Sequence, residues 1–212
     1  MKYRYLSIIL VLLIISIGAV SAQENTTSDD VIGIMQDDTI LSSSEYAIDD
    51  SNYDTYFNST TGKILENSNI SDGDTIKIGN VSDKMFTIDK NLIITSNSTD
   101  SVAVNTTFVF DGVNGSSISD LTIKNDELSA IYVKSSDTVN IENNVIQVTG
   151  AFDTDAFAIY ADLADNLNVN ANVISYVGKT NGTRINNAIR VSKSEGVAIT
   201  ENNLHINVPA GD

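Results

Sequence analysis

Residues 130–146 read AIYVKSSDTVNIENNVI, and two later segments repeat this pattern without a gap. Residues 158–174 read AIYADLADNLNVNANVI and residues 188–204 read AIRVSKSEGVAITENNL, so successive copies begin 28 and 30 residues apart. The insertions fall between the copies and not inside them. This behaviour is typical of a solenoid, in which each repeat is one coil and the variation collects in a loop.

Within each copy, apolar and polar residues alternate, as they do in strands that bury one face. Stacking of the coils would place like residues about 4.8 Å apart, which is the spacing of parallel strands. We therefore expect four columns of aliphatic side chains in the core: Ile131, Ile159 and Ile189; Val139, Leu167 and Val197; Ile141, Val169 and Ile199; and Ile146, Ile174 and Leu204. An antiparallel sandwich of short strands is the alternative fold, but it does not require like residues at matching offsets.

An asparagine recurs at one turn of every copy, at Asn144, Asn172 and Asn202. Asparagine tolerates a left-handed backbone, and stacked amide side chains can hydrogen-bond to one another along a solenoid. We therefore predict that these three residues form a structural ladder and not a binding site.

Weaker copies extend the series towards the N-terminus. Residues 121–123 (LTI) precede Val139 by 18 positions, and residues 92–94 (LII) precede Leu121 by 29. We align both tripeptides with the run that starts at Val139. On this alignment the chain is an all-β parallel β-helix of about five to six coils.

Four segments are expected along the chain: a signal peptide at 1–22, a flexible acidic spacer rich in Ser and Asp at 23–52, an N-terminal cap region at 53–74 and the β-helix repeats at 75–212. The first segment begins with Lys2 and Arg4, continues with an apolar stretch and ends in small residues that suit cleavage after Ala22. Its apolar stretch is shorter than the ~20 residues of a membrane-spanning helix, which favours cleavage over an uncleaved anchor. We expect an exported protein, either extracellular or displayed on the cell surface.

The composition narrows the classes of partner. The chain has 28 acidic and 12 basic residues, a formal net charge of −16 that becomes −18 once Lys2 and Arg4 are removed with the leader. Such acidity argues against nucleic acid as a partner and suits a soluble exported protein. With no Cys and one His, the chain offers neither a thiolate nor a pair of imidazoles to a transition metal, so we predict no metal and no cofactor.

Three runs carry a resemblance to a known family: residues 72–79 (DGDTIKIG), 86–94 (FTIDKNLII) and 119–125 (SDLTIKN). They resemble the opening of the adhesin-like surface proteins of methanogenic archaea. That family carries right-handed parallel β-helix repeats of the pectin-lyase-like superfamily, so the resemblance implies a right-handed helix, export, surface display and carbohydrate contact. It implies no activity, because such repeats occur in lyases, hydrolases and non-catalytic adhesins alike.

Pectin-cleaving members of that superfamily use clustered Asp residues with calcium and a base, or paired Asp residues with a helping His. The nearest candidates here are Asp153, Asp155, Asp162 and Asp165, with Arg184 and Arg190 one coil further on. The Gly-His-Gly and Arg-Ile-Lys motifs of the hydrolases are absent, and the one histidine, His205, falls at an outward position. We therefore predict a non-enzymatic protein; the alternative is a polysaccharide lyase or glycoside hydrolase.

Tyr132, Tyr160 and Arg190 occupy one outward position in three successive coils. At the strand spacing they should form a column about 10 Å long. Aromatic faces and a guanidinium group can stack on sugar rings and pair with their acidic groups, so we interpret the column as a strip that binds cell-wall or host polysaccharide. The alternative is an ordinary strand surface, on which outward tyrosines are common.

Eight Asn-x-Ser/Thr triplets are candidate glycosylation sites in an exported protein: Asn25, Asn58, Asn69, Asn80, Asn97, Asn105, Asn114 and Asn181. The last coil shows no cap in the sequence. Its open strand edge is expected to pair with another chain end to end, unless the sequence is part of a longer protein.

Overall fold

The computed structural model describes residues 43–150, 155–178 and 187–207. Within these ranges the chain forms strands β1 to β18 and one short helix, α2 (Tyr53–Tyr56). The predicted signal peptide at 1–22 lies outside the described residues, as do residues 23–42 of the predicted spacer.

The strands form three sheets. Sheet I contains, in order, β1 (Glu45–Ile48), β2 (Thr75–Ile78), β5 (Ile93–Ser96), β8 (Ser117–Ser119), β11 (Asn140–Glu142), β14 (Asn168–Asn170) and β17 (Ala198–Thr200). Sheet II contains β4 (Met85–Ile88), β7 (Thr107–Asp111), β10 (Ile131–Asp137), β13 (Ile159–Asp165) and β16 (Ile189–Ser192). Sheet III contains β3 (Val81–Ser82), β6 (Val102–Val104), β9 (Thr122–Asp126), β12 (Val145–Thr149), β15 (Val173–Val177) and β18 (Asn203–Asn207).

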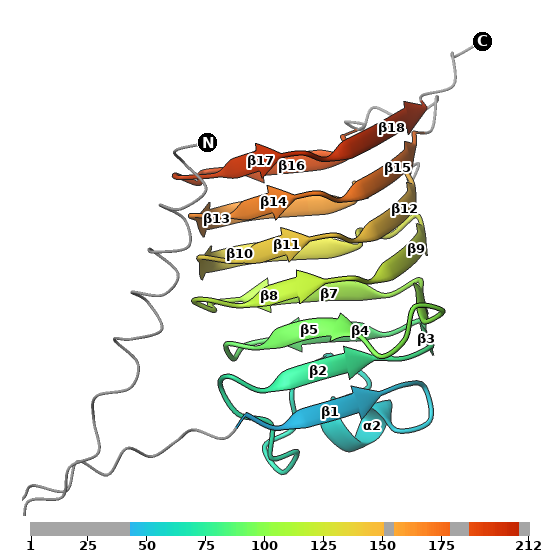
Figure 1. Ribbon diagram of the computed structural model, residues 1–212. Coiled ribbons are helices and arrows are strands. Elements are labelled where there is room, and N and C mark those ends of the chain that lie inside the picture. The colour runs from blue at the N-terminus through green and yellow to red at the C-terminus, as the bar shows by residue number, and fades with distance from the viewer. Residues whose placement is uncertain (1–42, 151–154, 179–186, 208–212) are drawn as a thin grey trace, which may run out of the picture. The chain divides into compact units, whose positions relative to one another are not determined.

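The chain visits the three sheets in turn and then begins the next coil. Strands β10, β11 and β12 lie in sheets II, I and III, and β13 then pairs with β10. Each inner strand therefore lies between its equivalents in neighbouring coils, as the stacked layers of Figure 1 show. Every ladder between these named strands is parallel. The architecture is all-β and compatible with the predicted parallel β-helix, and it excludes the antiparallel sandwich.

The predicted core columns lie in register. Ile131, Ile159 and Ile189 are paired across sheet II, and Ile146, Ile174 and Leu204 across sheet III. In sheet I the pairs join Ile141 to Val169 and Val169 to Ile199. The backbone N–H groups of Asn168 and Ala198 donate to the carbonyls of Val139 and Leu167, each at 2.9 Å, which places the fourth column in successive coils. The strand register predicted from the spacing of the three sequence copies is therefore confirmed between residues 130 and 204.

The prediction for residues 121–123 was wrong. Thr122 pairs with Val145 in sheet III, whereas the place beside Ile141 in sheet I belongs to Ile118. Residues 92–94 do lie in sheet I, where Ile94 pairs with Ile118. The error has a simple cause: a Leu-x-Ile pattern fits a half-buried strand in any sheet, and strand β8 has one apolar residue to mark its place.

Regular structure begins earlier than predicted, inside the expected spacer. Strand β1 pairs with β2 from Glu45 and Thr75 to Ile48 and Ile78, and Ile48 is buried. Asp74 secures this start, because one of its carboxylate oxygens accepts the N–H of Ser44 at 2.7 Å. Strand β1 is only four residues long and has acidic neighbours. The acidic composition of the segment therefore led to the prediction of a flexible spacer, and the strand was not predicted.

The segment expected to cap the helix packs on the first strand of sheet II. The rings of Tyr53 and Phe57 lie 5.1 and 4.9 Å from the ring of Phe86, measured between centroids. The Tyr53 hydroxyl donates to the backbone carbonyl of Met85. Tyr53 and Phe57 are fully buried, and Phe86 in turn stacks on Phe108 at 5.0 Å.

The ladder asparagines form a continuous chain of hydrogen bonds. Asn144 Nδ2 donates to Asn172 Oδ1 at 3.0 Å, and Asn172 Nδ2 donates to Asn202 Oδ1 at 2.9 Å. The same oxygens accept the backbone N–H groups of Asn144 and Asn172. The expected left-handed conformation lies one position earlier than the asparagines, at Asn143, Ala171 and Glu201, with φ of 57°, 53° and 56°.

Candidate functional site

Strands β10, β13 and β16 place Tyr132, Tyr160 and Arg190 at one register position of sheet II; we call these three residues the outward strip. Their neighbours on either side point into the core, so alternation turns the three side chains outward. The two tyrosine rings stack with centroids 4.8 Å apart and an interplanar angle of 13°. Arg190 Cζ lies 5.5 Å from the centroid of the Tyr160 ring, which continues the stack.

This stacking decides which surfaces of the strip a ligand can reach. Tyr160 lies between Tyr132 and Arg190, so both of its faces are occupied. On the other side of Tyr132 the column continues with Val109, which is only 9% exposed although it alternates with the buried Phe108 and Phe110. The strip therefore presents ring edges and hydroxyl groups, and sugar rings cannot lie flat on Tyr160 as the sequence analysis supposed.

A fourth side chain, Phe157, belongs to the strip and was missed by the sequence analysis. Its ring centroid lies 5.2 Å from that of Tyr160, and Arg190 Cζ lies 5.8 Å from it. Phe157 stands just before the Ala158 that opens its copy, where the other copies have Ser129 and Asn187. Because neither counterpart is aromatic, the repeat pattern gave no reason to single it out.

Three ion pairs surround the strip. Lys134 Nζ lies 2.9 Å from a carboxylate oxygen of Asp111. The other two pairs are longer, at 3.8 Å for Arg190 with Asp155 and 3.7 Å for Lys193 with Asp162. Each of these carboxylates faces one cation, so the described charges beside the strip balance in a chain whose formal net charge is −16.

The surroundings of Tyr132 favour the neutral form of its hydroxyl group. Burial raises the pKa of Tyr132 above its ordinary value, and the neighbouring Tyr160 and Asp162 raise it further. At neutral pH the hydroxyl of Tyr132 is therefore protonated and can both donate and accept a hydrogen bond.

Of the residues considered for catalysis, the structure brings Asp155 and Arg190 together, 3.8 Å apart. Asp155 and Asp162 face Arg190 and Lys193, and Asp165 accepts the backbone N–H of Glu195 at 2.8 Å. His205 pairs with Ser175 in sheet III, away from sheet II. The other two candidates, Asp153 and Arg184, lie outside the described residues, within which no group of three His, Cys, Asp or Glu side chains is arranged to hold a metal ion.

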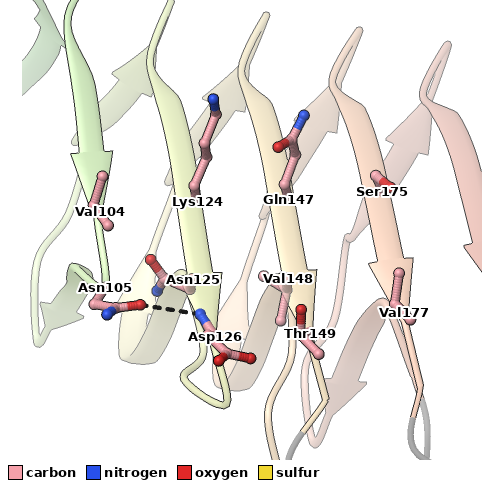
Figure 2. Close-up of a pocket in the computed structure, with 10 residues that line it drawn as sticks. All are labelled: Val104, Asn105, Lys124, Asn125, Asp126, Gln147, Val148, Thr149, Ser175 and Val177. Carbon is pink, nitrogen blue, oxygen red and sulfur yellow. Dashed lines mark hydrogen bonds between the residues drawn. The ribbon is translucent and has the colours of Figure 1, made fainter.

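A concave surface elsewhere on the molecule, which we call the groove of sheet III, has a volume of about 560 Å³ and is lined by the ten residues drawn in Figure 2. Its long axis follows a column of Lys124, Gln147 and Ser175, which are register neighbours on β9, β12 and β15. Asn105 closes one end, where its Oδ1 accepts the N–H of Asp126 at 3.1 Å. The groove offers amide, ammonium and hydroxyl groups but no aromatic ring among its lining residues.

The candidate glycosylation sites fall on the surface to different degrees. Five of the asparagines are exposed: Asn58, Asn69, Asn80, Asn97 and Asn114. Asn105 is half-buried, and Asn25 and Asn181 lie outside the described residues. Across the described ranges, no helix is long and apolar enough to traverse a lipid bilayer.

Comparison with known proteins adds no relative. No protein-family model matches the chain, and no curated protein and no solved structure matches it significantly. The comparisons therefore provide no evidence for an adhesin family, for an archaeal origin or for a catalytic activity, and the function must be argued from the fold and the surfaces described above.

Proposed function

We propose that this protein is an exported, right-handed β-helix of about five to six coils that acts at or outside the cell surface as a non-enzymatic, adhesin-like or structural module. Crossovers between parallel strands of one sheet are right-handed in nearly all proteins, which supports the hand. The leader at residues 1–22 supports export. In this proposal the module binds polysaccharide along the outward strip, and the single observation that carries it is the unbroken stack of Tyr132, Tyr160 and Arg190.

The geometry favours a neutral polysaccharide over an acidic one. Arg190 already faces Asp155, and a glycan carboxylate would have to compete with that carboxylate for the guanidinium group. Lys134 and Lys193 likewise face Asp111 and Asp162, so these cations too are already engaged with carboxylates. The hydroxyl groups of a neutral sugar do not compete with these carboxylates. They can donate hydrogen bonds both to the carboxylates and to the tyrosine hydroxyls.

The periodicity of the strip suits an extended polymer. A sugar chain that follows the axis of the stack meets an equivalent position at each coil, about every 4.8 Å. Because ring edges face the solvent, the expected contacts are hydrogen bonds to the tyrosine hydroxyls and apolar contact with the ring edges. Binding through such a shallow surface is expected to be weak for a short oligosaccharide and to strengthen with chain length.

The first experiment measures calorimetric binding of soluble β-glucan, mannan and polygalacturonate to the wild type and to Tyr132→Phe/Tyr160→Phe. The double variant keeps the stacked rings and loses both hydroxyl groups, so affinity for the neutral polymer should fall about tenfold or more. Gln147→Ala, in the groove of sheet III, is the matched control and should bind like the wild type. The same mixtures, assayed for unsaturated or reducing sugar ends, separate binding from cleavage.

The proposal fails if no neutral polymer binds, or if the double phenylalanine variant binds as the wild type does. Loss of binding in Gln147→Ala alone would move the site to sheet III. Release of sugar ends by the wild type would replace the non-enzymatic module with a lyase or hydrolase.

A further inference from the structure

Arg190 is the cation of the outward strip, and aromatic rings hold its guanidinium group in place. Its Cζ lies 5.5 Å from the ring centroid of Tyr160 and 5.8 Å from that of Phe157. The two ring centroids are 5.2 Å apart, so each of the three side chains contacts the other two. A guanidinium group fixed in this way loses little further freedom when it binds a ligand.

Asp155 faces this guanidinium group at a distance longer than a hydrogen bond. Its Oδ2 lies 3.8 Å from Arg190 Nη1, whereas N–H···O hydrogen bonds span about 2.7–3.2 Å. The pair of Lys134 and Asp111 differs, because at 2.9 Å the carboxylate oxygen occupies a donor of the ammonium group. Asp155 therefore offsets the charge of Arg190 and leaves the N–H groups of the guanidinium able to bind an oxygen atom of a ligand.

This arrangement distinguishes neutral from anionic ligands. A sugar hydroxyl group can accept an N–H bond from Arg190 and donate its own proton to Asp155, so a neutral sugar gains from both side chains. A glycan carboxylate can accept the same N–H bond, but it then lies close to the carboxylate of Asp155, and like charges repel at that distance. Both protein side chains are 35% exposed, so water moderates this repulsion without removing it.

We infer that Asp155 determines the charge selectivity of the outward strip. It offsets the charge of Arg190 and so excludes anionic polysaccharides, while the N–H groups of Arg190 serve neutral ones. The inference rests on the proposed binding of polysaccharide by the strip. The formal net charge of −16 also repels polyanions, but it acts over the whole surface, whereas Asp155 acts at the strip.

Asp155→Asn tests the inference, because it keeps the shape of the side chain and removes its charge. The ligands are hydroxyethyl cellulose and carboxymethyl cellulose, which share a backbone and differ in the charge of their substituents. Calorimetry at low ionic strength should show that the variant binds carboxymethyl cellulose about three- to fivefold more tightly than the wild type does. Its affinity for hydroxyethyl cellulose should change by less than about twofold. In about 1 M salt, which screens charges beyond ~3 Å, the gain should disappear.

Two further variants locate the effect. Asp89→Asn, at an exposed position after β4, removes the same charge away from the strip and should leave both affinities at their wild-type values. Asp155→Asn/Arg190→Gln also removes the released cation and should lose the gain for carboxymethyl cellulose. Circular dichroism of each variant verifies that it is folded.

Equal binding of carboxymethyl cellulose by the wild type and Asp155→Asn overturns the inference. A gain that persists in the double variant, or one that appears equally in Asp89→Asn, overturns it as well. Failure of the proposed function has a different signature. A gain through Arg190 without any binding of hydroxyethyl cellulose refutes the neutral-polysaccharide module and keeps the role of Asp155, whereas neutral binding that needs the hydroxyl groups of Tyr132 and Tyr160, with no gain in Asp155→Asn, does the reverse.

Discussion

At the scale of single residues, the interior of the stack depends on polar side chains that replace missing backbone partners. Asn172 is fully buried and makes bonds in both directions along the axis. Its Oδ1 accepts from Asn144, and its Nδ2 donates to Asn202 and to the carbonyl of Ile141, the latter at 2.8 Å. One side chain thus satisfies groups in three successive coils, which explains why asparagine recurs at this turn.

Asn172→Ala should destabilise the fold by about 2–4 kcal/mol, because it leaves buried donors and acceptors of the adjacent coils without partners. Asn203→Ala, at an exposed position of β18, should change the free energy of unfolding by less than about 0.5 kcal/mol. Urea denaturation followed by circular dichroism measures both. Equal midpoints for the two variants would show that the ladder contributes nothing specific.

At this scale, residues that recur in every copy could be predicted from the sequence, whereas residues that occur in one copy could not. The ladder asparagines repeat at a fixed offset, so their position could be predicted although the left-handed residue before them was not. Phe157 was missed because its counterparts are not aromatic. The mutual stacking of Tyr132 and Tyr160 depends on side-chain torsion angles, which strand spacing does not determine.

At the scale of elements, the strands of the later coils could be predicted from the sequence repeats, whereas several strands of the earlier coils could not. Strands β10 to β18 come from three copies that align without a gap and share their apolar and asparagine positions, and their register followed from the offsets. Strand β1 is isolated in sequence from its partner β2 by 26 intervening residues, 49–74, and no copy of it exists to align. Strand β8 has one apolar residue, so a better-matching tripeptide was aligned in its place. The groove of sheet III is formed by outward-facing residues of neighbouring strands. These positions do not repeat in the sequence, so the groove could not be predicted from it.

The contact between residues 57–64 and sheet II supports a prediction about Gly62. This residue has φ of +67°, and a Cβ added to it would lie 2.4 Å from the carbonyl oxygen of Met85. Gly62→Ala should therefore combine backbone strain with a clash against the backbone, and destabilise the fold by more than about 2 kcal/mol. The carbonyl of Gly62 also accepts the N–H of Thr87 at 2.7 Å, so the clash acts at the contact itself.

Gly73→Ala is the matched control for the clash. Gly73 has φ of +86°, but an added Cβ would meet no atom within 4 Å. Its variant should show the backbone strain alone, about 1 kcal/mol. Thermal unfolding of the two variants separates the effects, and an equal loss in both would show that the contact with Met85 adapts without cost.

At the scale of the whole molecule, each coil contacts only its neighbours, so the stability of the stack is a sum over adjacent layers. The aromatic side chains are concentrated at one end, where Tyr53, Phe57, Phe86 and Phe108 form a continuous packed group. Aliphatic columns continue from there to the last coil, where the burial decreases. Tyr53, the one member of this packed group that can ionise, belongs to that end.

The fold should therefore lose stability in alkali. Burial, with Asp54 as the second cause, raises the pKa of Tyr53 from 10.0 to about 12, and burial also raises the pKa of Tyr132 and Tyr176. A phenol whose pKa is higher in the folded chain favours folding below its unfolded value, near pH 10, and this contribution disappears as the pH rises towards 12.

For Tyr53 the shift corresponds to about 2–3 kcal/mol, lost between pH 10 and 12. Urea unfolding at pH 9 and pH 11.5 measures the decrease, and Tyr53→Phe should show a smaller decrease over the same interval although it starts less stable, since it also loses the bond to the Met85 carbonyl. A wild type equally stable at both pH values, or a Tyr53→Phe variant with the same decrease as the wild type, would show that this buried hydroxyl does not link ionisation to the stability of the stack.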